Sequence, residues 1–278
     1  MSVMSTNGQR HLLYRTTSSS SCLSQTANVR SREAVRCKSL IFSDFTFDNI
    51  DDGKQRSHRG GTTWMRFRSQ IEQLDRENFT IVAWEPPGYG KSRPPDNKTF
   101  PDNFHQRDAA WAHSLMKTLD YSKFSLLGFG DGGTTALLLA ATYPQSIRKM
   151  IVFGARSYIH QNEIAHCDNI GRRIEDLVPT EVCTDYFQKT WTEWVNTMKR
   201  LYVVQNGNLC QEALAKIKCP TLIIHGFEDK FVVPDQQLHL SQNIVNSRTY
   251  MFKKPPHDIY QKYPEVFNHK MTKFLLEK

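Results

Sequence analysis

Residues 124–142, FSLLGFGDGGTTALLLAAT, constrain the fold of this 278-residue chain more than any other stretch. A short apolar run suited to a buried strand leads into a glycine-rich turn and then into an Ala- and Leu-rich run of helical length. Two motifs fit the turn. Gly128, Gly130 and Gly133 spell G-x-G-x-x-G, the pattern of a dinucleotide-binding loop. Residues 128–132 also match G-x-S-x-G, the elbow that carries a nucleophilic serine, with Gly130 in the serine position.

Strands and helices alternate along the rest of the chain. Apolar and β-branched runs predict strands, and apolar residues at spacings of three and four predict helices. Such alternation is typical of an α/β fold, in which helices cover both faces of a parallel sheet. About 60 residues separate the strands at 149–154 and 219–226, more than one crossover needs, and they predict a helical cap at 157–216. The other predicted strands are 79–84, 124–128 and 248–252, and the predicted helices are 64–74, 104–119, 133–143, 234–243 and 264–277.

Residues 1–60 contain no convincing pair of strands, so we expect a poorly structured tail followed by one domain over 61–278. Residues 1–40 hold nine serines and six basic residues against Glu33 alone. This composition is typical of a mitochondrial transit peptide, and equally of a disordered tail on a cytoplasmic protein. Because most of the net charge of +8 lies in this tail, the excess of basic over acidic residues does not indicate nucleic-acid binding.

Membrane spans and metal sites are not indicated either. The longest apolar run, ALLLAA at 136–141, is far shorter than the ~20 residues that a spanning helix needs. We expect reduced thiols and no metal, because no two cysteines have C-x-x-C spacing. Nothing in the sequence indicates an oligomeric state. The six cysteines lie at 22, 37, 167, 183, 210 and 219.

The residues downstream of the glycine-rich turn separate the two motifs. A dinucleotide loop needs a carboxylate about 20 residues on, at the end of the next strand, to hold a ribose hydroxyl. That strand ends in FGARS (153–157), where Arg156 could face a phosphate but no carboxylate is present. A nucleophile elbow instead needs an acid and then a histidine, each after a later strand. Asp229 and His257 follow the last two predicted strands in that order, which favours the elbow.

Five segments carry a resemblance to a known family: FTIVAWEPPGYGKSRPP, SLLGFGDGG, ATYPQSIRKMIVFGA, DYFQKTWTEWV and CPTLIIHGFEDKFVVP. Over about residues 61–278 the chain resembles the α/β-hydrolase family and, within it, the valacyclovir-hydrolase (biphenyl-hydrolase-like) group of α-amino-acid esterases. The resemblance implies an α/β-hydrolase fold, hydrolysis of a small-molecule ester that bears an amine, and neither a metal nor an organic cofactor.

The resemblance also implies that the family's first strands precede the helix at 64–74. Residues 1–60 show no such strands, so we expect them to be missing or degenerate. HRGG at 58–61 is interpreted as a remnant of the turn that follows the third strand.

The resemblance assigns roles to four positions. Asp229 and His257 match the catalytic acid and base, and Gly130 stands where the family has serine. Asp131 matches the carboxylate that receives the ammonium group of the substrate, and its backbone N–H is an expected oxyanion donor. From the residues alone, Asp131 could also be an acid that stabilises the N-terminus of the helix.

Gly130 leaves the mechanism without an attacking atom, since Asp229 and His257 act by activating a nucleophile. We therefore expect the chain to be inactive or severely impaired as an ester hydrolase. Three alternatives stay open: a non-catalytic binding protein that uses the vacant pocket, a hydrolase that uses Asp131 as its nucleophile, and a nucleotide-binding protein.

Overall fold

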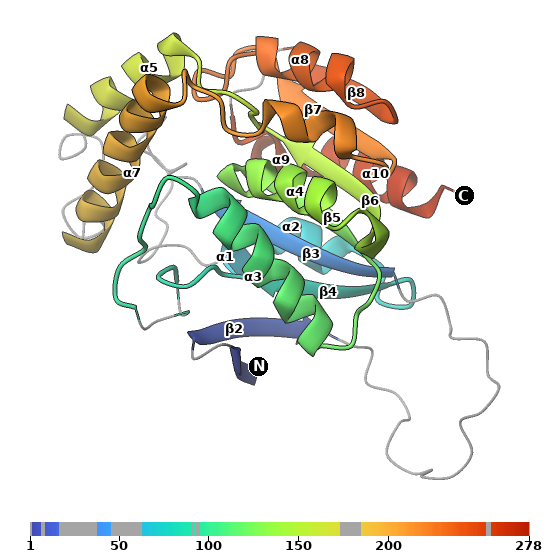
Figure 1. Cartoon of the computed structure of the whole chain (residues 1–278). Coiled ribbons are helices and arrows are strands. Elements are labelled where there is room, and N and C mark those ends of the chain that lie inside the picture. The colour runs from blue at the N-terminus through green and yellow to red at the C-terminus, as the bar shows by residue number, and fades with distance from the viewer. Residues whose placement is uncertain are drawn as a thin grey trace, which may run out of the picture.

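The computed structural model describes residues 2–6, 9–16, 38–45, 63–90, 92, 95–172, 185–253 and 257–277. Its strands form one eight-stranded sheet in the order β1-β2-β4-β3-β5-β6-β7-β8 (Figure 1). The strands are β1 (Ser2–Thr6), β2 (Gln9–Thr16), β3 (Lys38–Phe45), β4 (Phe79–Trp84), β5 (Phe124–Gly130), β6 (Ile147–Phe153), β7 (Thr221–Gly226) and β8 (Ser247–Phe252).

The sheet is antiparallel at one edge and parallel elsewhere. β1 pairs with β2 and β2 with β4 in antiparallel register, whereas the pairings from β4 through β3, β5, β6 and β7 to β8 are parallel. Every residue of β4, β5 and β7 is buried, as expected for strands covered on both faces. The predicted α/β fold with a mostly parallel sheet is confirmed. The carboxyl ends of its parallel strands share one edge, so the loops after β5, β6, β7 and β8 gather there.

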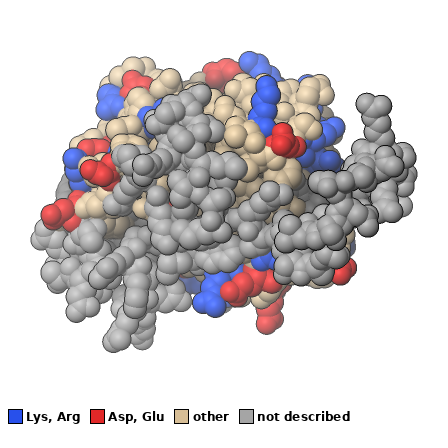
Figure 2. Space-filling view, turned by 90° about the horizontal axis from the view of Figure 1, so that it is seen from below, with Lys and Arg blue, Asp and Glu red and all other residues tan. Residues whose placement is uncertain are grey.

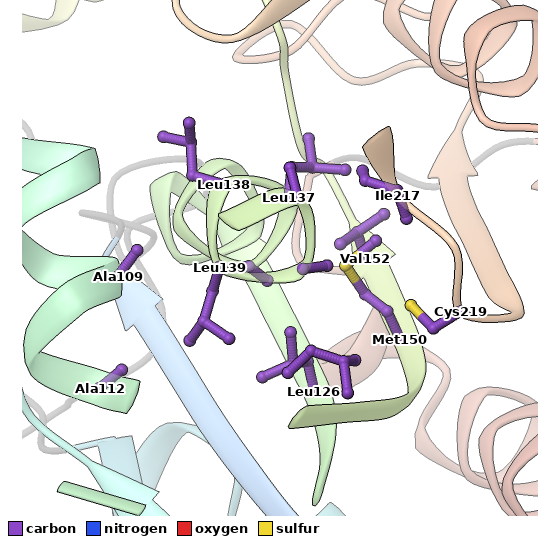
Figure 3. Close-up of a cluster of buried hydrophobic side chains, with 14 of the residues drawn as sticks. Ala109, Ala112, Leu126, Leu137, Leu138, Leu139, Met150, Val152, Ile217 and Cys219 are labelled. Carbon is purple, nitrogen blue, oxygen red and sulfur yellow. The ribbon is translucent and has the colours of Figure 1, made fainter. Parts of the chain in front are cut away.

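Helices cover both faces of this sheet (Figure 1). They are α1 (Thr63–Arg66), α2 (Arg68–Gln73), α3 (Phe104–Thr118), α4 (Asp131–Thr142), η1 (Pro144–Ser146), α5 (Gln161–Arg172), α7 (Asp185–Val204), η2 (Gln211–Lys216), α8 (Asp235–Asn243), α9 (Ile259–Lys262) and α10 (Pro264–Leu276). Side chains alternate along β5, so that Leu126 lies in the apolar cluster beneath α3 and α4, and Leu127 lies in the cluster beneath α2, α9 and α10. Figure 3 shows part of the first cluster, where α3, α4 and the strands converge.

Three strands lie within residues 1–60, so the prediction that the first strands are missing or degenerate is wrong. β3 pairs with β4 on one side and with β5 on the other, in the interior of the sheet. The sequence of β3, KSLIFSDF, has three consecutive apolar residues, and that of β2, QRHLLYRT, has LLY between polar residues. Runs this short carry little strand signal, and the pairing partners of β3 are distant in the sequence. The rest of the predicted tail, with the turn at 58–61, lies outside the described residues.

The segment predicted as a cap, 157–216, contains α5, α7 and η2, and its residues 173–184 lie outside the described residues. In Figure 1, α5 and α7 stand beside each other, away from the sheet. They share an apolar cluster that includes Cys167, Trp191, Trp194 and Leu201. This layer covers the loops that follow the strands, as the contacts of the site below show.

Several features of the described residues bear on partners. None of the described helices has the length and apolar character that a membrane crossing requires. Nor do the described His, Cys, Asp and Glu side chains form a group of three or more that could hold a metal ion. Cys167, Cys210 and Cys219 are buried free thiols. On the face in Figure 2, acidic and basic side chains of the described residues are interspersed.

Candidate active site

The junction of β5 and α4 is a sharp strand-to-helix elbow. Gly130 ends β5 and caps α4 with φ 54° and ψ −125°, a conformation that residues with a side chain rarely adopt. Close packing explains the other two glycines of the motif. A Cβ at Gly128 would lie 2.6 Å from the carbonyl oxygen of Gly132, and a Cβ at Gly133 would lie 2.5 Å from the Cβ of Ala155. These glycines let α4 approach the strands, so their pattern needs no bound pyrophosphate to explain it.

Asp229 and His257 lie together beyond the carboxyl ends of β7 and β8. His257 Nδ1 is 2.6 Å from Asp229 Oδ2, and both side chains are buried. The other carboxylate oxygen, Oδ1, accepts hydrogen bonds of 2.9 Å from the backbone N–H groups of Phe231 and Val232. The imidazole packs against the rings of Phe129 and Phe231, at centroid distances of 4.6 and 5.2 Å. The sequence predicted that these two residues meet, and their geometry is that of an acid that orients a histidine.

Burial and hydrogen bonding act in opposite directions on the Asp229 carboxylate. Burial alone would raise its pKa, because a charged group is costly away from water. The charge and hydrogen bond of His257, together with His225 and the Val232 N–H, outweigh burial and hold the pKa of Asp229 below its ordinary value. His225 Nε2 lies 2.8 Å from the Val232 carbonyl oxygen and 3.6 Å from Asp229 Oδ2, and burial lowers the pKa of His225. Asp229 is therefore ionised at neutral pH, as an orienting acid must be.

Asp131, the first residue of α4, is a buried carboxylate with two side-chain partners. Its Oδ1 lies 3.3 Å from His105 Nε2, and its Oδ2 accepts a hydrogen bond of 2.5 Å from Trp194 Nε1–H. Each carboxylate oxygen can accept more than one hydrogen bond, so the group keeps capacity for an ammonium ligand. The Asp131 N–H is among the first four of the helix, which have no acceptor within the helix, and it can serve an oxyanion. A nucleophile elbow takes its second oxyanion donor from the loop after the third strand, and the loop after β3 lies outside the described residues.

Three side chains near this site carry no motif that reveals them in the sequence. His105 lies on α3, Trp194 on α7 and Glu163 on α5. Glu163 accepts hydrogen bonds from the Arg156 guanidinium at 3.3 Å and from the Val233 N–H at 3.0 Å, and so connects the cap to the loops after β6 and β7. Helical periodicity could have marked the buried faces of these helices. Periodicity does not predict which polar side chain contacts Asp131, because that depends on how the helices pack against α4.

Comparisons with known proteins agree with this geometry. The family model described as "alpha/beta hydrolase fold" matches residues 58–169. Serine hydrolase BPHL of Mus musculus is 37% identical over 219 residues, which cover 75% of this chain and 74% of the mouse protein. Serine hydrolase BPHL of Homo sapiens is 35% identical over 215 residues, with the same shares covered.

Solved structures share the fold. The meta-cleavage product hydrolase CumD from Pseudomonas fluorescens IP01, in a mutant form complexed with acetates, superposes with a TM-score of 0.70 at 17% identity, covering 99% of this chain and 97% of that chain. Together with the elbow and the acid–histidine pair, these matches set aside the dinucleotide interpretation of the glycines. This chain belongs to the α/β-hydrolase family and is similar to serine hydrolase BPHL over three quarters of its length.

Proposed function

We propose that this chain binds small amine-bearing esters in an α/β-hydrolase site and hydrolyses them very slowly or not at all. Gly130 carries the proposal: it occupies the elbow from which a nucleophilic serine would attack, and it has no side chain. The BPHL relatives are named as serine hydrolases, and the resemblance to their group suggests an amino-acid ester as the ligand.

The remaining groups support only part of a hydrolase mechanism. In such a mechanism the histidine takes a proton from the serine hydroxyl while the serine attacks the ester carbonyl. His257, held by Asp229, is placed to accept a proton, but Gly130 offers no hydroxyl to give one. His257 could still draw a proton from water. That route lacks the covalent intermediate that divides one difficult step into two easier ones.

The charges around Asp131 favour a cationic ligand. Asp131, Glu163 and Asp229 all act electrostatically on a single buried guanidinium, that of Arg156. The Lys98 ammonium group also interacts electrostatically with Asp131, but it forms an ion pair with Asp108. Among the described residues Asp131 forms no ion pair with a lysine or arginine, so an ammonium group there would offset a buried negative charge, which is costly when it is unpaired.

Calorimetric titration with L-norleucine methyl ester tests the proposed binding. We expect the wild-type chain to bind this ester, and Asp131→Asn to weaken binding about tenfold or more, because a hydrogen bond to a charged group is worth about 1.5–3 kcal/mol. Asp120→Asn, at an exposed carboxylate, is the matched control and should bind like the wild type. The N-acetylated ester, which has no ammonium group, should not bind. Equal binding by wild type and Asp131→Asn, or no binding by the wild type, would contradict the proposal.

A further inference from the structure

The Asp131 carboxylate is held by side chains from elements other than its own helix. An acid in the first turn can stabilise a helix through the N–H groups that have no acceptor there. Both carboxylate oxygens instead contact other helices: Oδ1 lies 3.3 Å from His105 Nε2 on α3, and Oδ2 accepts the Nε1–H of Trp194 on α7 at 2.5 Å. Among the described residues, no N–H of α4 donates to this carboxylate. Its orientation is therefore set by α3 and by the cap.

The indole of Trp194 is fixed by its surroundings. Its side chain is buried in the apolar cluster of the cap. Its ring centroid lies 5.5 Å from that of Trp191, one turn earlier on α7, and 5.8 Å from Arg156 Cζ. A ring packed in this way loses little further freedom when its N–H holds an acceptor.

The helix that carries this indole is itself attached to the segment between β4 and α3. Tyr186 Oη–H donates to the Gly88 carbonyl oxygen at 2.5 Å, and Thr197 Oγ1–H donates to the Phe100 carbonyl oxygen at 3.1 Å. These two bonds lie on either side of Trp194 along α7. The indole N–H therefore reaches Asp131 from a helix that is anchored over two turns.

A neutral donor suits a carboxylate that has to bind a cation. The indole N–H of Trp194 is a donor only and carries no charge, so it orients Asp131 without cancelling its negative charge. A lysine or arginine in the same place would also orient the carboxylate, but its charge would repel an ammonium ligand. A carboxylate that is already oriented loses less conformational freedom when the ligand binds.

Resting on the function proposed above, we infer that Trp194 is a positioning residue for amine recognition. From the cap, its indole N–H holds the Asp131 carboxylate in the orientation that receives the ammonium group of the ligand, so binding of the amine depends on α7.

Calorimetry with L-norleucine methyl ester tests the positioning. Trp194→Phe keeps an aromatic ring and removes the N–H, and it should weaken binding about three- to tenfold, the contribution of one hydrogen bond. Trp191→Phe is the matched control, because it makes the same change at an equally buried position of the same helix. It should bind the ester within about twofold of the wild type.

Nuclear magnetic resonance of the indole N–H groups gives a readout that packing alone would not change. The chain has five tryptophans, and the signal that is missing from Trp194→Phe belongs to Trp194. This signal should shift in Asp131→Asn, which replaces its acceptor. It should also shift when the norleucine ester is added to the wild type, because the ammonium group then shares the carboxylate. Methyl hexanoate, which lacks the amine, should leave it in place.

The outcomes separate this inference from the proposal on which it rests. If the wild type binds the ester and Trp194→Phe binds it equally or more tightly, or if Trp191→Phe loses as much, Trp194 does not position Asp131 and the proposed function stands without it. If the wild type binds no ester, the proposed function fails and this inference fails with it. Should Trp194→Phe fold poorly by circular dichroism, the spectra of the wild type and Asp131→Asn decide: one indole signal that responds both to the ester and to Asp131→Asn supports the inference, and no such signal overturns it.

Discussion

At the residue scale, the proposed function distinguishes Gly130, which has no side chain that could attack an ester, from the hydrogen-bonded pair of Asp229 and His257. Asp229 and His257 are buried and 2.6 Å apart, which fixes the imidazole. Gly130 keeps the positive-φ backbone of an elbow at φ 54°. A side chain there would bear backbone strain of about 1–3 kcal/mol. Glycine therefore relaxes the turn while it removes the attacking atom.

His225 yields a prediction about acid stability. Burial lowers its pKa in the folded chain below the ordinary value of 6.5, so the unfolded chain takes up this proton at a higher pH. Its contribution to stability is complete above the unfolded pKa and is lost as the pH falls toward the folded pKa. Urea unfolding at about pH 7.5 and about pH 5.5 should show a smaller free energy of unfolding at the lower pH.

His225→Gln should reduce that difference between the two pH values. His239, whose pKa burial also lowers but whose ring is less deeply buried, provides the comparison variant His239→Gln, which should reduce the difference by less. An identical pH dependence in the wild type and His225→Gln would contradict the role assigned to His225.

At the scale of elements, the contact between α4 and the chain after β6 depends on Gly133. Its Cβ would lie 2.5 Å from the Cβ of Ala155. Gly133→Ala should therefore reduce the free energy of unfolding, because overpacking costs about 1–3 kcal/mol and exceeds the gain in helix propensity of about 1 kcal/mol. In an Ala155→Gly background only contacts of 3.3 Å remain, with the Cα of residue 155 and the carbonyl oxygen of Gly128, so Gly133→Ala should destabilise less. Chemical denaturation of the four proteins measures both effects, and a loss that is equal in both backgrounds would count against this packing.

The elements also show where prediction from sequence succeeds and where it fails. β4 to β8 were predicted because each contains a run rich in apolar, aromatic and β-branched residues, and the approach of Asp229 to His257 followed because parallel strands end at one edge. β3 was not predicted, because its apolar run is short and the strands that pair with it, β4 and β5, lie far along the chain. The contact of Trp194 with Asp131 was not predictable either, because it depends on how the cap docks on the elbow.

At the scale of the whole molecule, β3 lies in the interior of the sheet and connects the strands β1, β2 and β4 to the strands from β5 to β8. Ile41→Pro should destabilise the fold by on the order of 3 kcal/mol, because proline cannot donate to a ladder in the interior of a sheet. Met4→Pro in the edge strand β1 is the matched control and should cost much less. Urea unfolding compares the two variants. Equal, small losses would show that β3 is not required for the fold.

The amino-terminal segment joins this sheet through β1 and β2 as well. The mitochondrial location predicted from the composition of residues 1–40 stays a prediction. Cleavage between residues 16 and 38 would remove the two strands at the antiparallel edge and leave β3 paired with β4 and β5.

The central claim is that the elbow has lost its nucleophile and kept its acid–histidine pair, and pre-steady-state kinetics with a p-nitrophenyl ester of an α-amino acid tests it most directly. A burst of nitrophenol reports a covalent acyl-enzyme. The wild-type chain should show no burst. Gly130→Ser should show one, reduced by the backbone strain of about 1–3 kcal/mol that serine must bear, and Gly130→Ser/His257→Ala should show none. A burst in the unmodified chain that survives His257→Ala and disappears in Asp131→Asn would contradict the claim, because Asp131 would then be the nucleophile.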